Sequence, residues 1–225
     1  MEILRAALTI ALKDLRVEMR SKEVINTAVS FTLVVLLMFS FAFDPSDEET
    51  RTVAGGLLWV VFSFAGILVL NRSFARETLN DCLDALVASP VSGAPILLGK
   101  AMSNTILLLV LELITLPVFG IFYNVRWTNS LGWLALVFFL GTWGFTVVGT
   151  LFSALTVNVA LREAMLPLLV FPITLPILMA SVALTTTLFS GEPIAQELLW
   201  LRVLFGCDLI FTVLAGALVE YILVG

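Results

Sequence analysis

The sequence predicts an all-α polytopic membrane protein, and two observations carry that prediction. Apolar residues make up 60% of the 225 residues and charged residues only 13%, a composition far from that of a soluble domain. In addition, six apolar runs are each long enough to cross about 30 Å of hydrocarbon, which takes about 20 helical residues. Because a backbone in lipid must satisfy its own hydrogen bonds, these runs are predicted to be helices.

The six transmembrane helices are expected at residues 24–43, 53–71, 101–123, 131–157, 164–189 and 203–224. With residues 1–22 they form a single transmembrane domain over residues 1–225. Nine of the 12 Lys and Arg residues lie before the first span or in the second and fourth loops. By the positive-inside rule, this bias places both termini in the cytoplasm.

Residues 1–22 are expected to form an amphipathic helix at the membrane surface. Its apolar residues recur at helical spacing and share one face: Ile3, Leu4, Ala7, Leu8, Ala11, Leu12, Leu15 and Met19. Basic residues on the other side would meet anionic headgroups. Charges at Lys13, Asp14 and Arg16 interrupt any apolar core, so a signal peptide is not expected. Two interpretations stay open: a simple anchor, and an elbow that bends the chain into the first span.

The segment 72–100 is the one long polar interruption between two spans, and it is predicted to be cytoplasmic. Leu79, Leu83 and Leu86 share one face of a short amphipathic helix. Ser89-Pro90 ends that helix, because proline cannot continue the hydrogen-bond ladder. Since the helix is held between two spans, a soluble partner that grips it could move both.

The chain is not expected to hydrolyse ATP. Residues 93–101 superficially resemble a P-loop, but five residues separate Gly93 and Gly99 where the motif has four. Ala101 also stands where Ser or Thr is required, and no strand precedes the motif. Any energy source must therefore be another chain.

No metal or haem site is expected, because the chain has no histidine. The absence of histidine also excludes serine-histidine proteases and HExxH metalloproteases. Methionines in apolar spans are usually packing residues, which is the interpretation given to Met38, Met102, Met165 and Met179. Cys82 and Cys207 are predicted near opposite membrane faces, so they form neither a disulfide nor a metal site.

Two carboxylates are candidate intramembrane polar groups, Glu112 and Asp208. Glu112 is predicted near mid-bilayer, Asp208 near the outer end of the sixth span and Glu220 near its inner end. These depths do not match, so a catalytic carboxylate pair is not expected. For Glu112, one hypothesis is a contact at a subunit seam or a coupling-ion site; the other is a protonated, hydrogen-bonded core acid.

Pro167, Pro172 and Pro176 each remove a helical hydrogen bond from the fifth span, which is therefore predicted to be kinked or broken. Two interpretations of this helix stay open: a static bend, and a flexing element tied to the turn at Arg162 and Glu163. In the fourth span, glycines permit close helix approach: Gly141, Gly144 and Gly149.

Several of these residues together resemble a known family. The order Arg72, Phe74, Arg76-Glu77, Leu83-Asp84, Leu86, Ser89-Pro90 and Lys100 resembles the signature of membrane subunits of ABC exporters. With the proline-rich stretch 172–177, the chain is similar over its whole length to the CcmB family, permease-like subunits of cytochrome c maturation systems. Asp81-Cys82 departs from the pattern, since family members often carry glycine there.

The resemblance implies an ABC exporter-type transmembrane domain in the bacterial inner membrane that is not itself an enzyme. Its function would be to couple ATP hydrolysis to haem export, or to release of a haem-loaded periplasmic chaperone, in c-type cytochrome biogenesis. The implied partners are a cytoplasmic ABC ATPase that binds ATP, a haem-handling membrane protein, a small tethering subunit and a second copy of this chain. No nucleic acid is expected. The ATPase-coupling interface would comprise Arg72, Arg76, Glu77, Leu79, Asp81, Leu83, Asp84, Leu86, Ser89, Pro90, Arg162 and Glu163.

Two alternatives remain at this stage. One is an exporter subunit for a lipid, a drug or another small molecule. The other is an ion-coupled carrier or a scaffold without an ATPase, which is disfavoured because no inverted repeat is visible.

Overall fold

The computed structural model describes residues 2–43, 48–74, 93–125, 127–157, 159 and 161–224. Its elements are α1 (Glu2–Ser21), α2 (Glu23–Ala42), α3 (Glu48–Ser73), α6 (Gly93–Phe122), η1 (Thr128–Ser130), α7 (Leu131–Thr156), α8 (Arg162–Phe189), η2 (Ile194–Glu197) and α9 (Leu198–Val224). No strand occurs among the described residues, and six of the helices are long and apolar enough to span a membrane. The chain is an all-α polytopic membrane protein, as the composition predicted.

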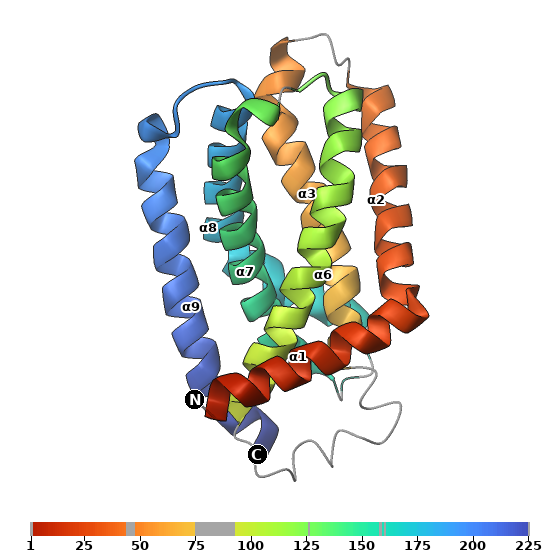
Figure 1. Ribbon diagram of the computed structural model, residues 1–225, viewed down its shortest axis with the longest axis vertical. Coiled ribbons are helices and arrows are strands. Elements are labelled where there is room, and N and C mark those ends of the chain that lie inside the picture. Colours follow the sequence, from red (N-terminus) through yellow and green to blue (C-terminus); the bar gives the residue numbers. More distant parts are fainter. Residues whose placement is uncertain are drawn as a thin grey trace.

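The six long helices form a bundle around α7, which contacts α3, α6, α8 and α9 (Figure 1). Of the apolar span in α7, 72% is buried by the rest of the chain, against 22% in α2 and 17% in α9. The helices α2 and α9 therefore form opposite edges of the bundle and present most of their surface outward (Figure 1).

Aromatic side chains fill the space between α3 and α7. Trp59, Phe62 and Phe138 meet edge to face, with ring centroids 5.5 to 5.9 Å apart. The Trp59 Nε1–H also donates a hydrogen bond of 2.9 Å to Thr185 Oγ1 on α8. One tryptophan thus links three central helices, and its polar atom does not remain unsatisfied in an apolar core.

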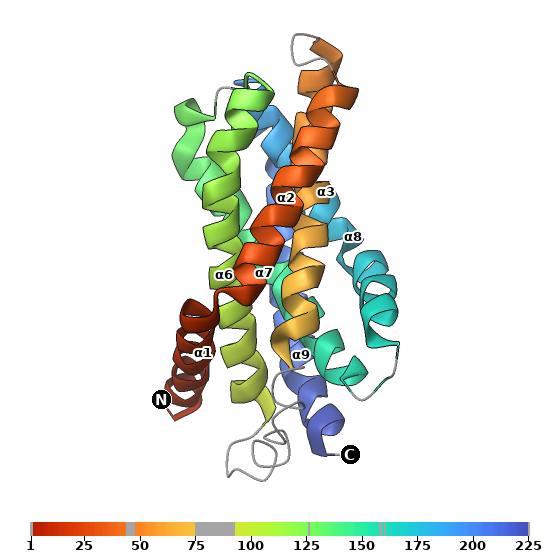
Figure 2. The same ribbon diagram turned by 90° about the vertical axis from the view of Figure 1, so that its right-hand side faces the viewer.

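The helix α1 lies across one end of the bundle and packs on α6 (Figures 1 and 2). This confirms the predicted N-terminal helix, but its apolar face divides into two parts. The small residues Ala7 and Ala11 are buried against the bundle, whereas Leu4, Leu8 and Leu12 are exposed. The exposed leucines lie where an interfacial helix would insert into lipid. We call this end of the bundle the α1 end.

Three helices begin five or more residues earlier than the apolar runs indicated. The helix α3 starts at Glu48, not at residue 53, α6 starts at Gly93, not at residue 101, and α9 starts at Leu198, not at residue 203. The added residues of each helix are less apolar than the span they precede, so hydropathy alone placed all three starts too late. For α6 the extra turns include Lys100, whose environment defines the candidate site.

Candidate functional site

The predicted coupling segment is described only at its two ends. Arg76, Glu77, Leu79, Asp81, Leu83, Asp84, Leu86, Ser89 and Pro90 lie outside the described residues, as does Cys82. The chain enters the segment at Phe74, after α3, and leaves it at Gly93, where α6 begins. Both points lie at the α1 end, as does the start of α8, which carries Arg162 and Glu163 (Figure 2).

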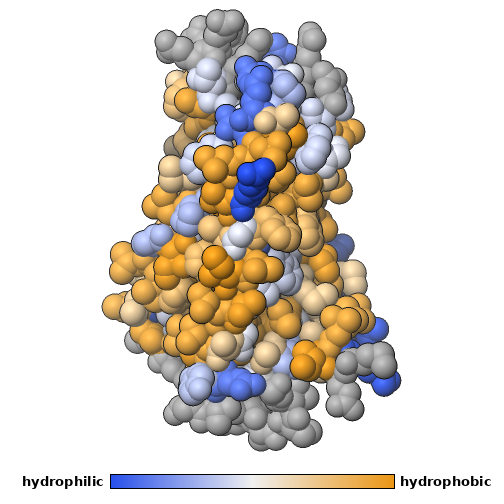
Figure 3. Space-filling model, turned by 90° about the vertical axis from the view of Figure 1, so that its left-hand side faces the viewer, coloured by the Kyte–Doolittle hydropathy of each residue, from blue (hydrophilic) through white to orange (hydrophobic). Residues whose placement is uncertain are grey.

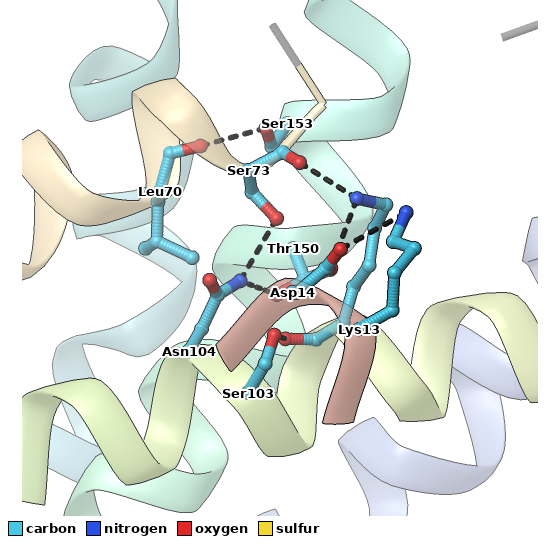
Figure 4. A network of polar contacts seen from close by, with 9 residues as sticks. Lys13, Asp14, Leu70, Ser73, Ser103, Asn104, Thr150 and Ser153 are labelled. Atoms are coloured by element: carbon cyan, nitrogen blue, oxygen red, sulfur yellow. Dashed lines mark hydrogen bonds and ion pairs between the residues drawn. The ribbon is translucent and has the colours of Figure 1, made fainter. Parts of the chain in front are cut away.

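A fully buried lysine joins α1 to both flanks of this segment. Lys100, at 0% exposure, donates to the backbone carbonyl oxygen of Ser73 over 2.7 Å and to Asp14 Oδ2 over 3.3 Å; the two acceptor residues are labelled in Figure 4. Its Nζ also lies 4.7 Å from the centroid of the Phe74 ring. Because Ser73 ends α3, the ammonium group meets the negative end of that helix and satisfies one of its terminal carbonyl groups.

A second set of hydrogen bonds fixes the last turn of α3 against α6 and α7. Asn104 Nδ2 lies 3.0 Å from both Ser73 Oγ and Thr150 Oγ1, and Ser153 Oγ donates to the Leu70 carbonyl oxygen over 2.8 Å (Figure 4). Buried polar groups of this kind specify one arrangement, since any shift would leave them unsatisfied. We refer to Asp14, Ser73, Lys100, Asn104 and Thr150 as the elbow network.

The turn between α1 and α2 is itself a tightly held elbow. Lys22 adopts a left-handed conformation, with φ of 52°, which reverses the chain direction between the two helices. The Glu18 carboxylate, which is buried, accepts hydrogen bonds of 2.9 and 3.0 Å from the backbone N–H groups of Val24 and Ile25. A carboxylate at a helix N-terminus satisfies unpaired amides and complements the helix dipole. The geometry favours the elbow interpretation over a simple anchor.

An exposed ion pair adds a third connection at this end. Arg72 donates from one guanidinium nitrogen to Glu23 Oε1 over 2.7 Å, which links the end of α3 to the start of α2. Both side chains are about half exposed, and such pairs contribute about 0 to 1 kcal/mol. Breaking a buried pair such as Lys100 and Asp14 by removing one partner costs about 3–5 kcal/mol. The elbow network therefore dominates the energetics of the α1 end.

The glycines of the apparent P-loop serve helix packing. A Cβ added at Gly99 would lie 2.6 Å from the Ala7 carbonyl oxygen and 2.8 Å from Ile10 Cβ, so α1 rests directly on the α6 backbone there. At Gly93 an added Cβ would lie 3.3 Å from the backbone of Val219 and Glu220 on α9. The two glycines lie where α1 and α9 cross α6, so phosphate binding is not needed to explain their spacing.

The residues Arg162 and Glu163 belong to the first turn of α8 and not to a preceding turn. The helix continues without interruption to Phe189 through Pro167, Pro172 and Pro176, so of the predicted kinked or broken helix the break is wrong. It bends instead, away from the bundle toward its Arg162 end (Figure 2).

The predicted close approaches in α7 are present: a side chain at Gly141 would collide with Trp59 and Ser181, and one at Gly149 with Leu70.

Glu112 lies inside the bundle and not at its surface. Its side chain is 2% exposed, and Thr142 donates to Oε1 over 2.5 Å, while Oε2 has no partner among the described residues. The adjoining cavity has a volume of about 10 Å³ and is lined mainly by aromatic and apolar side chains, among them Trp59, Phe62 and Phe145. A space of this size is at the lower limit for one water molecule. The arrangement favours a core acid over a subunit seam.

Asp208 lies deeper in the bundle than the sequence predicted. It is on the third turn of α9, and a side chain at Gly144, midway along α7, would collide with its carboxylate. Glu112 contacts Thr142 on the same part of α7, so the two acids share a similar depth. The predicted mismatch in depth is therefore wrong. The acids line separate cavities, one between α7 and α9 and one on the α3 side of α7, so they form no pair.

No cluster of three or more His, Cys, Asp or Glu side chains that could hold a metal ion occurs within the described ranges. Cys207 is a free thiol and is partly buried. The polar geometry of the described residues is therefore that of a helix-linking network, and it offers no nucleophile paired with a base.

Comparison with known proteins assigns the chain to a family. The family model described as CcmB protein matches residues 5–219. The chain belongs to the CcmB family. Among its CcmB relatives, heme exporter protein B of Rhodobacter capsulatus is 30% identical over 166 residues, which cover 74% of this chain and 76% of that protein. Heme exporter protein B of Pseudomonas aeruginosa is 28% identical over 198 residues, which cover 88% of each chain. The protein of that name from Paracoccus denitrificans is 28% identical over 167 residues, covering 74% and 76%.

The CcmB match begins within α1 and ends within α9, so it includes the whole elbow network. The sequence pattern identified Arg72 and Lys100. It did not predict that Asp14 pairs with Lys100, that Asn104 bonds Ser73 and Thr150, or that Glu18 caps α2. One signal was available. Ala7, Ala11, Asp14 and Glu18 recur at spacings of four, three and four residues, which places two acids on the buried side of α1.

Proposed function

We propose that this chain is the membrane subunit of an ATP-driven complex that serves haem export in c-type cytochrome biogenesis. The observation that carries the proposal is the family match over residues 5–219, together with relatives that bear the name heme exporter protein B. In this proposal the chain lies in the bacterial inner membrane, and the α1 end faces the cytoplasm, as the distribution of Lys and Arg predicts.

ATP hydrolysis belongs to a separate cytoplasmic ATPase, and the chain itself is not catalytic. The ATPase would grip the segment between Phe74 and Gly93, with Arg162 and Glu163 as a second contact. Motion of that segment would reach α3 through Ser73 and α6 through Gly93. Because Lys100 bonds both Ser73 and Asp14, α1 would move together with the two spans. A haem-handling membrane protein, a small tethering subunit and a second copy of this chain would complete the assembly, and haem would be bound by the partners.

Deletion of the gene tests the function. We expect loss of covalently bound haem in c-type cytochromes, measured by haem staining of membrane and periplasmic fractions, with recovery when the intact chain is supplied. Normal cytochrome levels in the deletion strain would contradict the proposal. A drug or lipid exporter would give that result, which separates the two classes.

Co-purification tests the coupling. Charge reversal at Asp84, together with Leu83→Ala and Leu86→Ala, is expected to abolish co-purification of the ATPase with the chain. The matched control is Leu113→Ala on α6, whose side chain is 72% exposed on the apolar surface of the bundle. ATPase binding retained in the triple variant would contradict the assignment of the coupling segment.

A further inference from the structure

An apolar groove runs between α7 and α9 on the edge of the bundle formed by α9. It has a volume of about 340 Å³, and its lining residues are Phe139, Leu140, Trp143, Phe205, Asp208, Leu209, Thr212 and Val213. Figure 3 shows the side of the molecule that includes α9, where apolar side chains dominate the middle of the surface. Three lining residues one turn apart on α9 are well exposed: Phe205 at 61%, Leu209 at 59% and Val213 at 65%.

Asp208 lies at the base of this groove without a partner. Its side chain is 5% exposed, and neither carboxylate oxygen has a hydrogen-bond partner among the described residues. The indole N–H of Trp143, also in the lining, is satisfied, since it donates to Thr212 Oγ1 over 3.1 Å. The absence of a side chain at Gly144 gives the carboxylate its place against α7. The groove therefore holds one pair of free acceptor oxygens within apolar walls.

An unpaired carboxyl group in a bilayer is costly, because hydrocarbon supplies no hydrogen-bond donor. Acidic residues at membrane depth usually pair with another group, and polar side chains often join neighbouring transmembrane helices. A lipid chain would fill the groove but leave both oxygens unsatisfied. The occupant that fits is a transmembrane helix carrying a basic or hydroxyl side chain at the depth of Asp208.

A second copy of this chain offers no basic donor at that depth through α9, and the hydroxyl group nearest Asp208 on this helix, that of Thr212, lies one turn away and already accepts from Trp143. A two-fold axis along the membrane normal would place α9 against α9, with one Asp208 facing the other. The nearest basic residue along the helix, Arg202, is six positions away, or about 9 Å along the helix axis. Lys100, the basic residue within α6, is buried in the elbow network.

We propose that the groove between α7 and α9 binds a transmembrane helix of a different membrane protein, whose basic or hydroxyl side chain donates to Asp208. The helix packs along Phe205, Leu209 and Val213 and inserts its donor between α7 and α9. This surface lies on the edge of the bundle opposite α2 (Figure 1). The inference does not depend on haem as the cargo, because it rests on the groove and its carboxylate.

Photo-crosslinking in native membranes tests this. The photoreactive amino acid p-benzoylphenylalanine is placed at Leu209 or at Val213, with Leu113 on α6 as the matched exposed control. We expect the first two positions, and not the third, to give an adduct that maps to a transmembrane helix of another protein. That helix must carry a Lys, Arg, His, Ser, Thr or Tyr side chain within one turn of the crosslinked position.

Two variants connect the adduct to the carboxylate and to the groove. Asp208→Leu is expected to lower the adduct yield about tenfold, the change that a loss of about 1.4 kcal/mol produces. Val213→Trp fills the groove without altering Asp208 and is expected to abolish the adduct from Leu209, whereas Leu113→Trp leaves it unchanged. Adducts only with a second copy of this chain, adducts only with lipid, or an undiminished yield in Asp208→Leu would overturn the proposal. Loss of ATPase coupling with intact crosslinking would instead count against the proposed function alone.

Discussion

The α1 end and the middle of α9 differ in how they accommodate buried ionisable side chains. At the α1 end, Lys100 bonds to Asp14 and Ser73, and Glu18 accepts from two backbone amides. In the middle of α9, Asp208 is nearly as deeply buried but has no partner in the described chain. Buried ionisable groups therefore have two uses here. Where the chain supplies the partner, the group fixes its own helices; where it does not, the group is available to another protein.

The largest expected effect is that of Lys100→Met. Removing the ammonium group leaves the Ser73 carbonyl without its donor and takes from Asp14 the buried one of its two cations, so the free energy of unfolding should fall by about 3–5 kcal/mol. The measurement is unfolding of the purified chain in detergent, followed by tryptophan fluorescence. Lys13→Met is the matched control, because Lys13 contacts the same Asp14 over 3.0 Å but is half exposed. Equal losses in the two variants would refute the dominance of the buried pair.

A smaller loss is expected from Gly99→Leu. The new side chain would meet the α1 backbone at Ala7, and overpacking of this kind costs about 1–3 kcal/mol. Gly206→Leu on α9 is the control, since an added Cβ there has nothing within 4 Å. The same unfolding assay should separate them, and indistinguishable stabilities would mean that α1 is not seated on α6.

Glu18→Ala should cost about 0.5–2 kcal/mol, because the first turn of α2 loses the acceptor for two amides. Glu18→Gln retains one acceptor oxygen and should lose less. Helix content by circular dichroism, recorded during thermal unfolding, provides the readout. An identical midpoint for the wild type and Glu18→Ala would show that the cap contributes nothing.

The smallest effect is expected at the exposed pair of Arg72 and Glu23. Arg72→Gln should change stability by about 0–1 kcal/mol, and the difference should vanish in about 1 M salt, where screening acts within about 3 Å. Unfolding at low and high salt measures this. If Arg72→Gln lost more stability than Lys100→Met, the exposed pair of Arg72 and Glu23 would contribute more than the pair of Lys100 and Asp14, contrary to the expected ranking.

Composition and hydropathy were sufficient to predict the helices, because crossing a bilayer constrains length and apolar content directly. They were not sufficient for starts such as Gly93 and Leu198, since these first turns are less apolar than the spans they precede. The predicted depth of Asp208 was wrong for the same reason. Once α9 begins at Leu198, Asp208 moves from the end of the span toward its middle.

The elbow network could not be predicted, although each member is visible in the sequence. Asp14 and Lys100 are 86 residues apart, and only the crossing of α1 over α6 at Gly99 brings them together. The sequence did identify Glu112 and Asp208 as unusual. It could not tell that one has Thr142 as a donor and the other faces an apolar groove, because neighbours across helices depend on tertiary packing.

The most direct test of this contrast compares Lys100→Met with Asp208→Leu in the purified chain without any partner. Because Asp208 has no donor within the described chain, an apolar side chain there should leave stability unchanged or raise it by about 1–3 kcal/mol. Lys100→Met should lower it. Opposite signs, or a loss confined to Lys100→Met, are the predicted result. A comparable loss in Asp208→Leu would show that its carboxylate already stabilises the isolated chain and would contradict the account.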